Sequence, residues 1–202
     1  MLKLIKVAVT GGLSCGKSTF CRFLKDCGAA VINADEIVHQ QLSPNTRIGQ
    51  EVVKLLGSEI VREDHLDRTL IAKKVFNNPE YLKKLEVLLH PAVHEEIEKY
   101  YQQIAKAGTA KVFIAEVPLL YETGGEKQFH KTIVVAADAA LSRNRFNTLQ
   151  QNSNSYEQRA LRQMPLEEKL KRADYVVWNN GNLSDLEHAA KQIYQILVHT
   201  AE

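Results

Sequence analysis

The chain has 202 residues, of which 45% are hydrophobic and 25% are charged, a composition typical of a globular protein. Its net charge of +2 is too small for a protein that coats nucleic acid, so we expect no nucleic-acid partner. No stretch approaches the roughly 20 apolar residues of a membrane span, and we expect no membrane partner. Three cysteines, Cys15, Cys21 and Cys27, fit neither a disulfide framework nor a zinc site. Together these features predict a cytoplasmic protein.

Short apolar runs, rich in Val or Ile and flanked by helical patterns, recur along the chain and predict buried parallel β-strands. The sequence therefore predicts the α/β class, with a doubly wound parallel five-stranded sheet. The runs are Ile5–Thr10, Ala30–Asn33, Lys111–Ala115, Thr132–Ala136 and Tyr175–Trp178.

Amphipathic spacing predicts helices between and after these strands. Gly28 is placed to end the first of them as a residue with positive φ. The expected helices are Lys17–Cys27, Arg47–Leu56, Asp67–Phe76, Glu80–Leu89, Pro91–Ala107 and Leu183–Val198.

We expect one domain over 1–202, whose core comprises 1–45, 108–140 and 173–202. The long helical insertion, 46–107, is expected to be a substrate-binding subdomain. A second insertion, 141–172, is rich in Lys and Arg, and it is either a solvated helix face or a lid that closes over substrate. Its polar stretch 150–155 is expected to be exposed and mobile.

The first strand runs into a loop that matches G-x-x-x-x-G-K-[ST], the phosphate-binding loop of nucleoside triphosphatases and kinases. Backbone N–H groups and the helix N-terminus favour phosphate. Lys17 is expected to reach the β- and γ-phosphates, and the Ser18 hydroxyl to bind Mg²⁺. The expected ATP-binding residues here are Gly12, Leu13, Ser14, Cys15, Gly16, Lys17, Ser18 and Thr19.

Cys15 allows two interpretations. Its side chain can be a small group that points away while its N–H binds phosphate. Alternatively, the helix N-terminus and Lys17 lower the pKa of the thiol and make it oxidisable.

Two carboxylates follow strands whose carboxyl ends share an edge with the phosphate-binding loop. Asp35 follows the second strand and is either a general base or Mg²⁺ group, or an N-cap of the next helix. Glu116 ends the third strand and either acts on Mg²⁺ through water or is a solvated carboxylate at the edge of the sheet.

Several segments, in order along nearly the whole chain, resemble the dephospho-CoA kinase family. They are the loop in its setting Val9-Thr10-Gly11-Gly12, then Asn33-Ala34-Asp35, His90-Pro91, Glu116-Val117-Pro118-Leu119-Leu120-Tyr121-Glu122, Arg159 with Gln163, Ala173-Asp174-Tyr175-Val176-Val177, and Asn179-Asn180-Gly181. Asn33 replaces the family's first Asp, and Ser14 and Cys15 replace the usual Gly and Ser of the loop.

The resemblance implies transfer of the γ-phosphate of ATP, with Mg²⁺, to the ribose 3′-hydroxyl of dephospho-CoA. It implies Asp35 as the catalytic base beside Lys17, and a lid that neutralises the transferred phosphate. The implied ATP contacts beyond the loop are Arg143, Asn179 and Gly181, and the implied substrate contacts are Asp35, His90, Leu119, Glu122 and Arg159.

Some of these assignments stay open in the sequence. His90 also fits a packing role, and Glu122 also fits a cap on the loop before Gly124. Arg143 and Arg145 both fit the lid arginine that reaches ATP, since neither has an arginine four residues later.

The sequence also bears on two other functions. Another small-molecule kinase of this loop type, such as a nucleoside monophosphate kinase, also fits a helical insertion and a lid. A GTP-driven switch does not, because the chain lacks N-K-x-D and D-x-x-G. The oligomeric state is not indicated by the sequence.

Overall fold

The computed structural model describes residues 4–76, 78–149 and 154–200. The chain divides into two compact units, one made of the residues up to Asn33 together with those from Tyr101, and the other of Ala34–Tyr100. Each unit has its own core and is described by itself.

The first unit contains a five-stranded sheet in the order β2-β5-β1-β6-β7, and every neighbouring pair is parallel. The predicted sheet is therefore confirmed. Register places Val9 of β1 opposite Glu116 of β5, and Gly11 opposite Val135 of β6. The strands are β1 Ile5–Gly11, β2 Ala30–Asn33, β5 Val112–Glu116, β6 Lys131–Ala136 and β7 Tyr175–Trp178.

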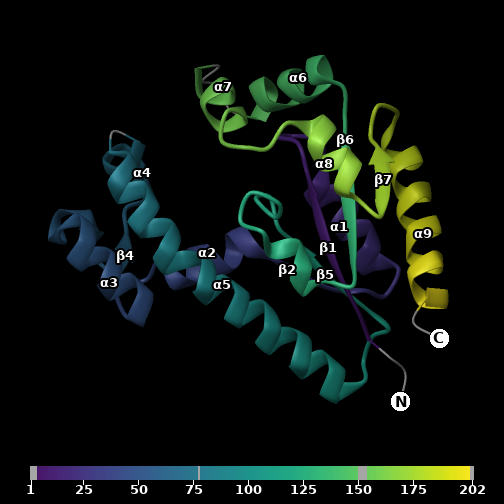
Figure 1. Cartoon of the computed structure of the whole chain (residues 1–202), viewed down its shortest axis with the longest axis horizontal. Helices are drawn as coiled ribbons and strands as arrows, with labels where there is room; N and C mark the ends of the chain where they lie inside the picture. The colour runs from purple at the N-terminus through teal and green to yellow at the C-terminus, as the bar shows by residue number, and fades with distance from the viewer. Residues whose placement is uncertain (1–3, 77, 150–153, 201–202) are drawn as a thin grey trace. The chain divides into compact units, whose positions relative to one another are not determined.

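One face of this sheet is covered by α1 (Lys17–Asp26) and α9 (Leu183–Thr200), which lie side by side in Figure 1. Their buried residues, Phe20, Leu24, Leu186, Ala190 and Leu197, pack with the inward side chains of the strands. Every residue of β1 is buried, as expected for a central strand of a parallel sheet that is covered on both faces.

The ends of these two helices follow from local sequence. Gly28 has φ 107°, and its N–H donates to Lys25 O at 2.9 Å, so this glycine ends α1 as predicted. Before α9, the Asn182 N–H donates to the Asp185 carboxylate while the Asp185 N–H donates to the Asn182 side chain, each at 3.0 Å. This reciprocal pair satisfies two N–H groups where α9 begins.

The second unit is built mainly from helices, with a short antiparallel hairpin. Its core includes Val52, Ile60, Leu66 and Ile71. The hairpin was not predicted, because two-residue strands leave no alternating pattern. The elements are α2 Ala34–Gln41, α3 Arg47–Leu56, η1 Ser58–Ile60, β3 Val61–Arg62, β4 His65–Leu66, α4 Arg68–Phe76 and α5 Pro79–Ala107. The residues of α5 from Tyr101 on belong to the first unit.

One prediction about α5 is wrong. Two helices were expected, separated at Pro91, but a single helix of 29 residues includes this proline. Pro91 has no N–H for the carbonyl of Val87, and Val87 is 65% exposed, so water can satisfy that carbonyl. The buried stripe Leu85, Leu89, Ala92, Val93 and Ile97 continues through the proline at helical spacing, and its packing holds the helix together.

The segment expected to form a lid contains three helices of the first unit, namely α6 Ala139–Leu149, α7 Asn154–Ala160 and α8 Leu166–Arg172. The polar stretch expected to be exposed lies mostly outside the described residues, and α7 begins at Asn154. A short 3₁₀ helix, η2 (Gly125–Gln128), precedes β6.

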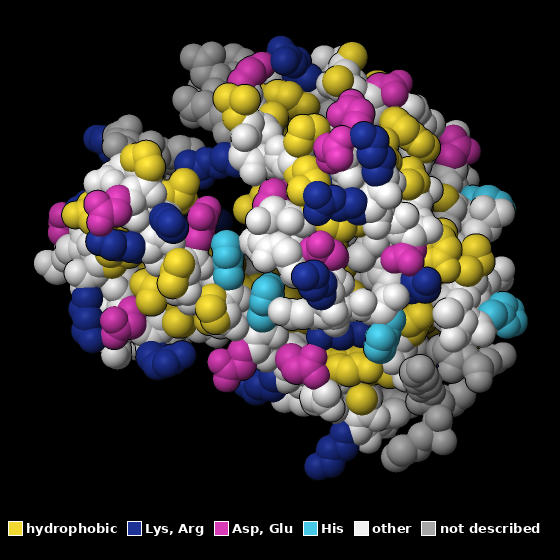
Figure 2. Space-filling view, viewed as in Figure 1, with side chains coloured by type: hydrophobic (Ala, Val, Ile, Leu, Met, Phe, Trp, Pro, Cys, Tyr) yellow, Lys and Arg dark blue, Asp and Glu magenta, His cyan; other side chains and the backbone are white. Residues whose placement is uncertain are grey.

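Among the described residues, no helix is both long and apolar enough to cross a membrane. On the face drawn in Figure 2, Lys and Arg side chains are interspersed with Asp and Glu.

The start of β7 is fixed to β6 by a carboxylate. Asp174 accepts hydrogen bonds from the Thr132 N–H at 2.8 Å, the Thr132 hydroxyl at 3.1 Å and Lys131 Nζ at 3.0 Å. Partial burial acts to raise the pKa of Asp174, but the hydrogen bonds from the Thr132 N–H and Lys131 outweigh it and hold the pKa below its ordinary value.

We predict that Asp174→Asn lowers the free energy of unfolding at pH 7 by about 1–2 kcal/mol. A lowered folded-state pKa means that this stabilisation is present above the unfolded pKa and is lost as pH falls through the folded pKa. The difference should therefore shrink below roughly pH 4, as measured by urea unfolding at several pH values. The exposed Asp26→Asn serves as the control, and a pH-independent difference would contradict the assignment.

Candidate active site

The phosphate-binding loop connects β1 to α1 and requires unusual backbone angles. Gly16, directly before α1, has φ 96°, and a Cβ added there would lie 2.3 Å from Asn179 Nδ2, so only glycine fits. Ser14 also has positive φ, at 52°, where the family's usual glycine would meet no steric penalty.

Side chains hold three carbonyl oxygens of this loop. Lys17 Nζ donates to Gly12 O at 2.6 Å, Asn179 Nδ2 to Cys15 O at 2.9 Å, and Lys169 Nζ lies 3.5 Å from Gly11 O. In a planar trans peptide, a carbonyl and the next N–H point in opposite directions. Each held carbonyl therefore sets the direction of the N–H group that follows it.

Ser18, at the start of α1, contacts the end of β5. The Ser18 hydroxyl donates to Glu116 Oε1 at 2.7 Å, and Asn33 Nδ2 donates to Glu116 Oε2 at 3.0 Å. Glu116 is only 4% exposed, so it is not the solvated carboxylate that was one of the two expectations. A hydroxyl beside a buried carboxylate is an oxygen donor set suited to Mg²⁺.

A cavity of about 800 Å³ opens beside the loop and is lined entirely by the first unit. The α6 residues that line it, Leu141, Asn144, Arg145 and Thr148, follow the spacing i, i+3, i+4, i+7 and so share one helix face. Asn179, Gly181, Asn182, Leu183 and Leu186 line it from the other side, and Ser14 to Thr19 form its floor.

The two arginines that both fit the predicted lid contact with ATP, Arg143 and Arg145, differ in their surroundings. Arg145 lines the cavity, and its NH1 atom is buried without a hydrogen-bond partner among the described residues. Arg143 lies off that helix face, and its guanidinium pairs with Glu157 of α7 at 2.9 Å. A guanidinium that lines a cavity beside a phosphate-binding loop and still has an unsatisfied donor is suited to an anionic ligand.

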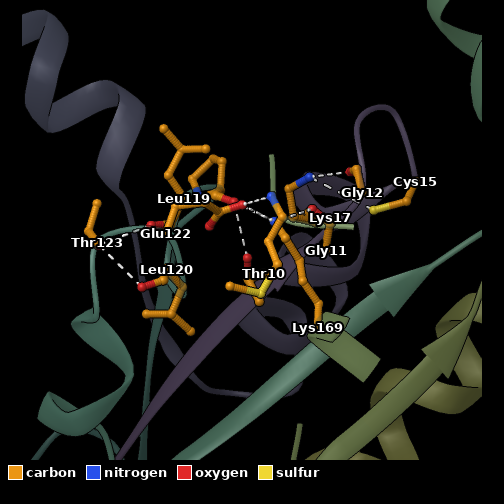
Figure 3. A network of polar contacts seen from close by, with 12 residues as sticks. Thr10, Gly11, Gly12, Cys15, Lys17, Leu119, Leu120, Glu122, Thr123 and Lys169 are labelled. Carbon is orange, nitrogen blue, oxygen red and sulfur yellow. Dashed lines mark hydrogen bonds and ion pairs between the residues drawn. The ribbon is translucent and has the colours of Figure 1, made fainter. Parts of the chain in front are cut away.

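A second set of polar contacts lies beside the loop, as Figure 3 shows. Lys169 of α8 is fully buried and forms an ion pair with Glu122 at 2.9 Å. Glu122 Oε1 also accepts the Met164 N–H at 2.6 Å, so the carboxylate is directed at this segment rather than at the loop before Gly124. Burial lowers the pKa of Lys169, and the Glu122 carboxylate opposes that shift.

The other residues singled out in the sequence are placed as follows. Leu119 is half-buried, and its carbonyl accepts the Thr123 hydroxyl at 2.9 Å. Arg159 of α7 lies over the Phe146 ring. Asp35 and His90 belong to the second unit. Asp35 is exposed in the first turn of α2, past the N-cap position, and His90 is half-buried within α5.

Cys15 is 1% exposed and belongs to the hydrophobic core beneath the sheet. This placement agrees with a small side chain that packs into the core while its backbone forms part of the loop. Cys21 is also buried, and burial raises the pKa of its thiol.

Comparison with known proteins decides the family. The sequence profile of dephospho-CoA kinase matches residues 5–185. A curated dephospho-CoA kinase from Protochlamydia amoebophila is 49% identical over 199 residues, covering 98% of each chain. The chain belongs to the dephospho-CoA kinase family. A Chlamydia pneumoniae dephospho-CoA kinase is 43% identical, again over 98% of each chain.

Solved structures agree with this family. A Thermus thermophilus protein superposes with TM-score 0.82 at 33% identity, covering 96% of this chain and 98% of that one. Dephospho-CoA kinase from Campylobacter jejuni superposes with TM-score 0.72 at 28% identity, covering 97% and 98%. A Bacteroides thetaiotaomicron shikimate kinase, TM-score 0.54 at 15% identity over 96% and 98%, shares the fold.

Sequence reasoning assigned no role to Lys169, which was only one of several lid cations. The sequence signal for its burial was that Lys169 shares one face of a short helix with Leu166 and Leu170. For Arg145, the signal was the helical spacing from Leu141 to Thr148, which places Arg145 but not Arg143 on the face of α6 that lines the cavity.

We predict that Arg145→Ala weakens binding of a non-hydrolysable ATP analogue with Mg²⁺ by about ten-fold or more, because the anionic ligand loses a positively charged donor. Arg143→Ala removes only an exposed ion pair and should change affinity by less than about two-fold. Isothermal titration of both variants checks this, and a larger loss for Arg143→Ala would contradict it.

Proposed function

We propose that this chain transfers the γ-phosphoryl group of ATP to the ribose 3′-hydroxyl of dephospho-CoA, which yields coenzyme A and ADP. The observation that carries the proposal is a phosphate-binding loop beside an 800 Å³ cavity in a chain that matches dephospho-CoA kinases over its full length. The reaction is the last step of coenzyme A synthesis, and a cytoplasmic location with no nucleic-acid partner belongs to the same proposal.

The ATP end of the reaction uses the first unit. The loop residues Gly12 to Thr19 bind the phosphates, and Asn179 and Gly181 lie on the cavity wall where the adenine is expected. Lys17 exchanges its contact with Gly12 O for the β- and γ-phosphates, where its charge stabilises the transition state. Ser18 and Glu116 would hold Mg²⁺, which neutralises phosphate charge when bound.

Asp35 is the proposed general base that accepts the proton of the 3′-hydroxyl. The support is chain connectivity, since only Ala34 separates it from Asn33, whose amide donates to Glu116. The carboxyl ends of parallel strands share one edge of a sheet, so a carboxylate that follows β2 is a candidate to accept the proton of a substrate hydroxyl.

The proposed acceptor contacts are His90, Leu119, Glu122 and Arg159. For Glu122, the support is its Oε2 atom, which is buried without a hydrogen-bond partner among the described residues, so one acceptor of this carboxylate is left to be satisfied. In this proposal the helical insertion 46–107 receives the coenzyme A moiety, and 141–172 closes as a lid over the transferred phosphate.

The reaction is tested directly by incubating the protein with Mg-ATP and dephospho-CoA and measuring the products by mass spectrometry. We expect coenzyme A and ADP, with little product when nucleoside monophosphates replace dephospho-CoA. Faster transfer to a nucleoside monophosphate would instead identify another small-molecule kinase.

We predict that Asp35→Asn lowers kcat by on the order of 10²–10⁴ with little change in the affinity for ATP, because the hydroxyl loses its proton acceptor. Glu36→Gln is a matched control, since Glu36 is the exposed neighbour in the same first turn. Near wild-type kcat for Asp35→Asn would exclude the base assignment.

A further inference from the structure

Lys169 is a charged residue with no exposed surface. Its hydrogen-bond acceptors all lie in or near the phosphate-binding loop. An ammonium group has three N–H donors. Three oxygens surround this one, Glu122 Oε1 at 2.9 Å, Pro118 O at 3.2 Å and Gly11 O at 3.5 Å. All of its donors are therefore directed at the ends of β1 and β5 and at the loop that follows β5, as Figure 3 shows.

These contacts place a positive charge behind the phosphate-binding loop. Gly11 ends β1, and Pro118 follows the end of β5, so the ammonium lies against carbonyls at the carboxyl ends of two neighbouring strands. Carbonyl oxygens carry partial negative charge and would repel a phosphate. The Thr10 hydroxyl also donates to Pro118 O at 3.2 Å, which completes the neutralisation of that carbonyl.

The contact with Gly11 O has a directional effect. Since the peptide that joins Gly11 and Gly12 is planar and trans, a carbonyl held by Lys169 turns the Gly12 N–H to the opposite side. At Gly12 no atom lies within 4 Å of an added Cβ, so space is open there for a ligand. Lys169 thus directs a loop N–H away from the protein interior without itself reaching the ligand.

The same ammonium is connected to the chain that returns from α7. Glu122 Oε1 accepts both the Lys169 ammonium and the Met164 N–H. Met164 lies between α7 and α8, within the segment expected to close as a lid. The position of this backbone and the orientation of the Gly12 N–H therefore depend on one carboxylate–ammonium pair.

We propose that Lys169 is a positioning residue for nucleotide binding, which orients the Gly12 N–H through Gly11 O and connects it to the lid segment through Glu122. The proposal rests on the proposed binding of ATP at the loop.

The first test compares Lys169→Met with Lys171→Met, which removes the same charge from the exposed side of the same helix. The probe is a non-hydrolysable ATP analogue with Mg²⁺, and adenosine is a second probe that has no phosphate. We expect Lys169→Met to weaken binding of the ATP analogue by about ten-fold and to leave adenosine affinity unchanged. Lys171→Met should leave both affinities unchanged. Equal weakening of both probes by Lys169→Met would show damage to the whole cavity and would overturn the proposal.

A second variant covers the case in which Lys169→Met alone does not fold, because it leaves Glu122 buried and unpaired. Replacement of a whole buried ion pair by apolar residues is often neutral or stabilising. Lys169→Met combined with Glu122→Leu should therefore recover stability in urea unfolding, while affinity for the ATP analogue stays about ten-fold weaker. Recovery of wild-type affinity with stability would show a purely structural pair and overturn the proposal.

These outcomes are separate from the identity of the acceptor. If the wild-type chain binds the ATP analogue but does not phosphorylate dephospho-CoA, the proposed function fails while the affinities still decide the role of Lys169. If the wild-type chain does not bind the analogue, both proposals fail.

Discussion

The orientation of a few peptide planes in the loop between β1 and α1 is the constraint on which this site depends. An amide N–H binds phosphate only when its peptide is turned the right way, and free backbone would favour other orientations. Here Asn179, which follows the edge strand β7, fixes the Cys15 carbonyl, and Lys17 fixes that of Gly12. The loop therefore reaches its ligand-ready form from contacts made by distant elements, and not from its own sequence alone.

The same constraint explains why so much charge is buried in the first unit. Glu116, Lys17 and Lys169 are each less than 10% exposed, a costly arrangement unless every group has a partner. Glu116 is satisfied by Ser18 and Asn33. The sheet thus carries an apolar core on one face and a partnered set of charges at the carboxyl ends of its strands, where parallel topology directs ligands.

The sequence predicted the sheet well because each strand is a short apolar run bounded by polar turns. It predicted the phosphate-binding loop because few other structures use the spacing G-x-x-x-x-G-K-[ST] between a strand and a helix. It failed where long-range packing overrides a local rule. Pro91 is a helix breaker by propensity, yet a continuous buried stripe carries α5 through it. Lysine is usually a surface residue, and only the folded structure shows that Lys169 and Glu122 form a buried ion pair. The choice of Arg145 over Arg143 could not be made until the structure showed which face of α6 lines the cavity.

Trp178 is the single tryptophan of the chain, ends β7 with 54% of its surface exposed, and directly precedes Asn179 on the cavity wall. All indole fluorescence of the protein therefore arises from one position that directly precedes a residue of the cavity beside the phosphate-binding loop. The natural chain consequently carries a built-in optical probe there, which requires no attached dye and no added tryptophan.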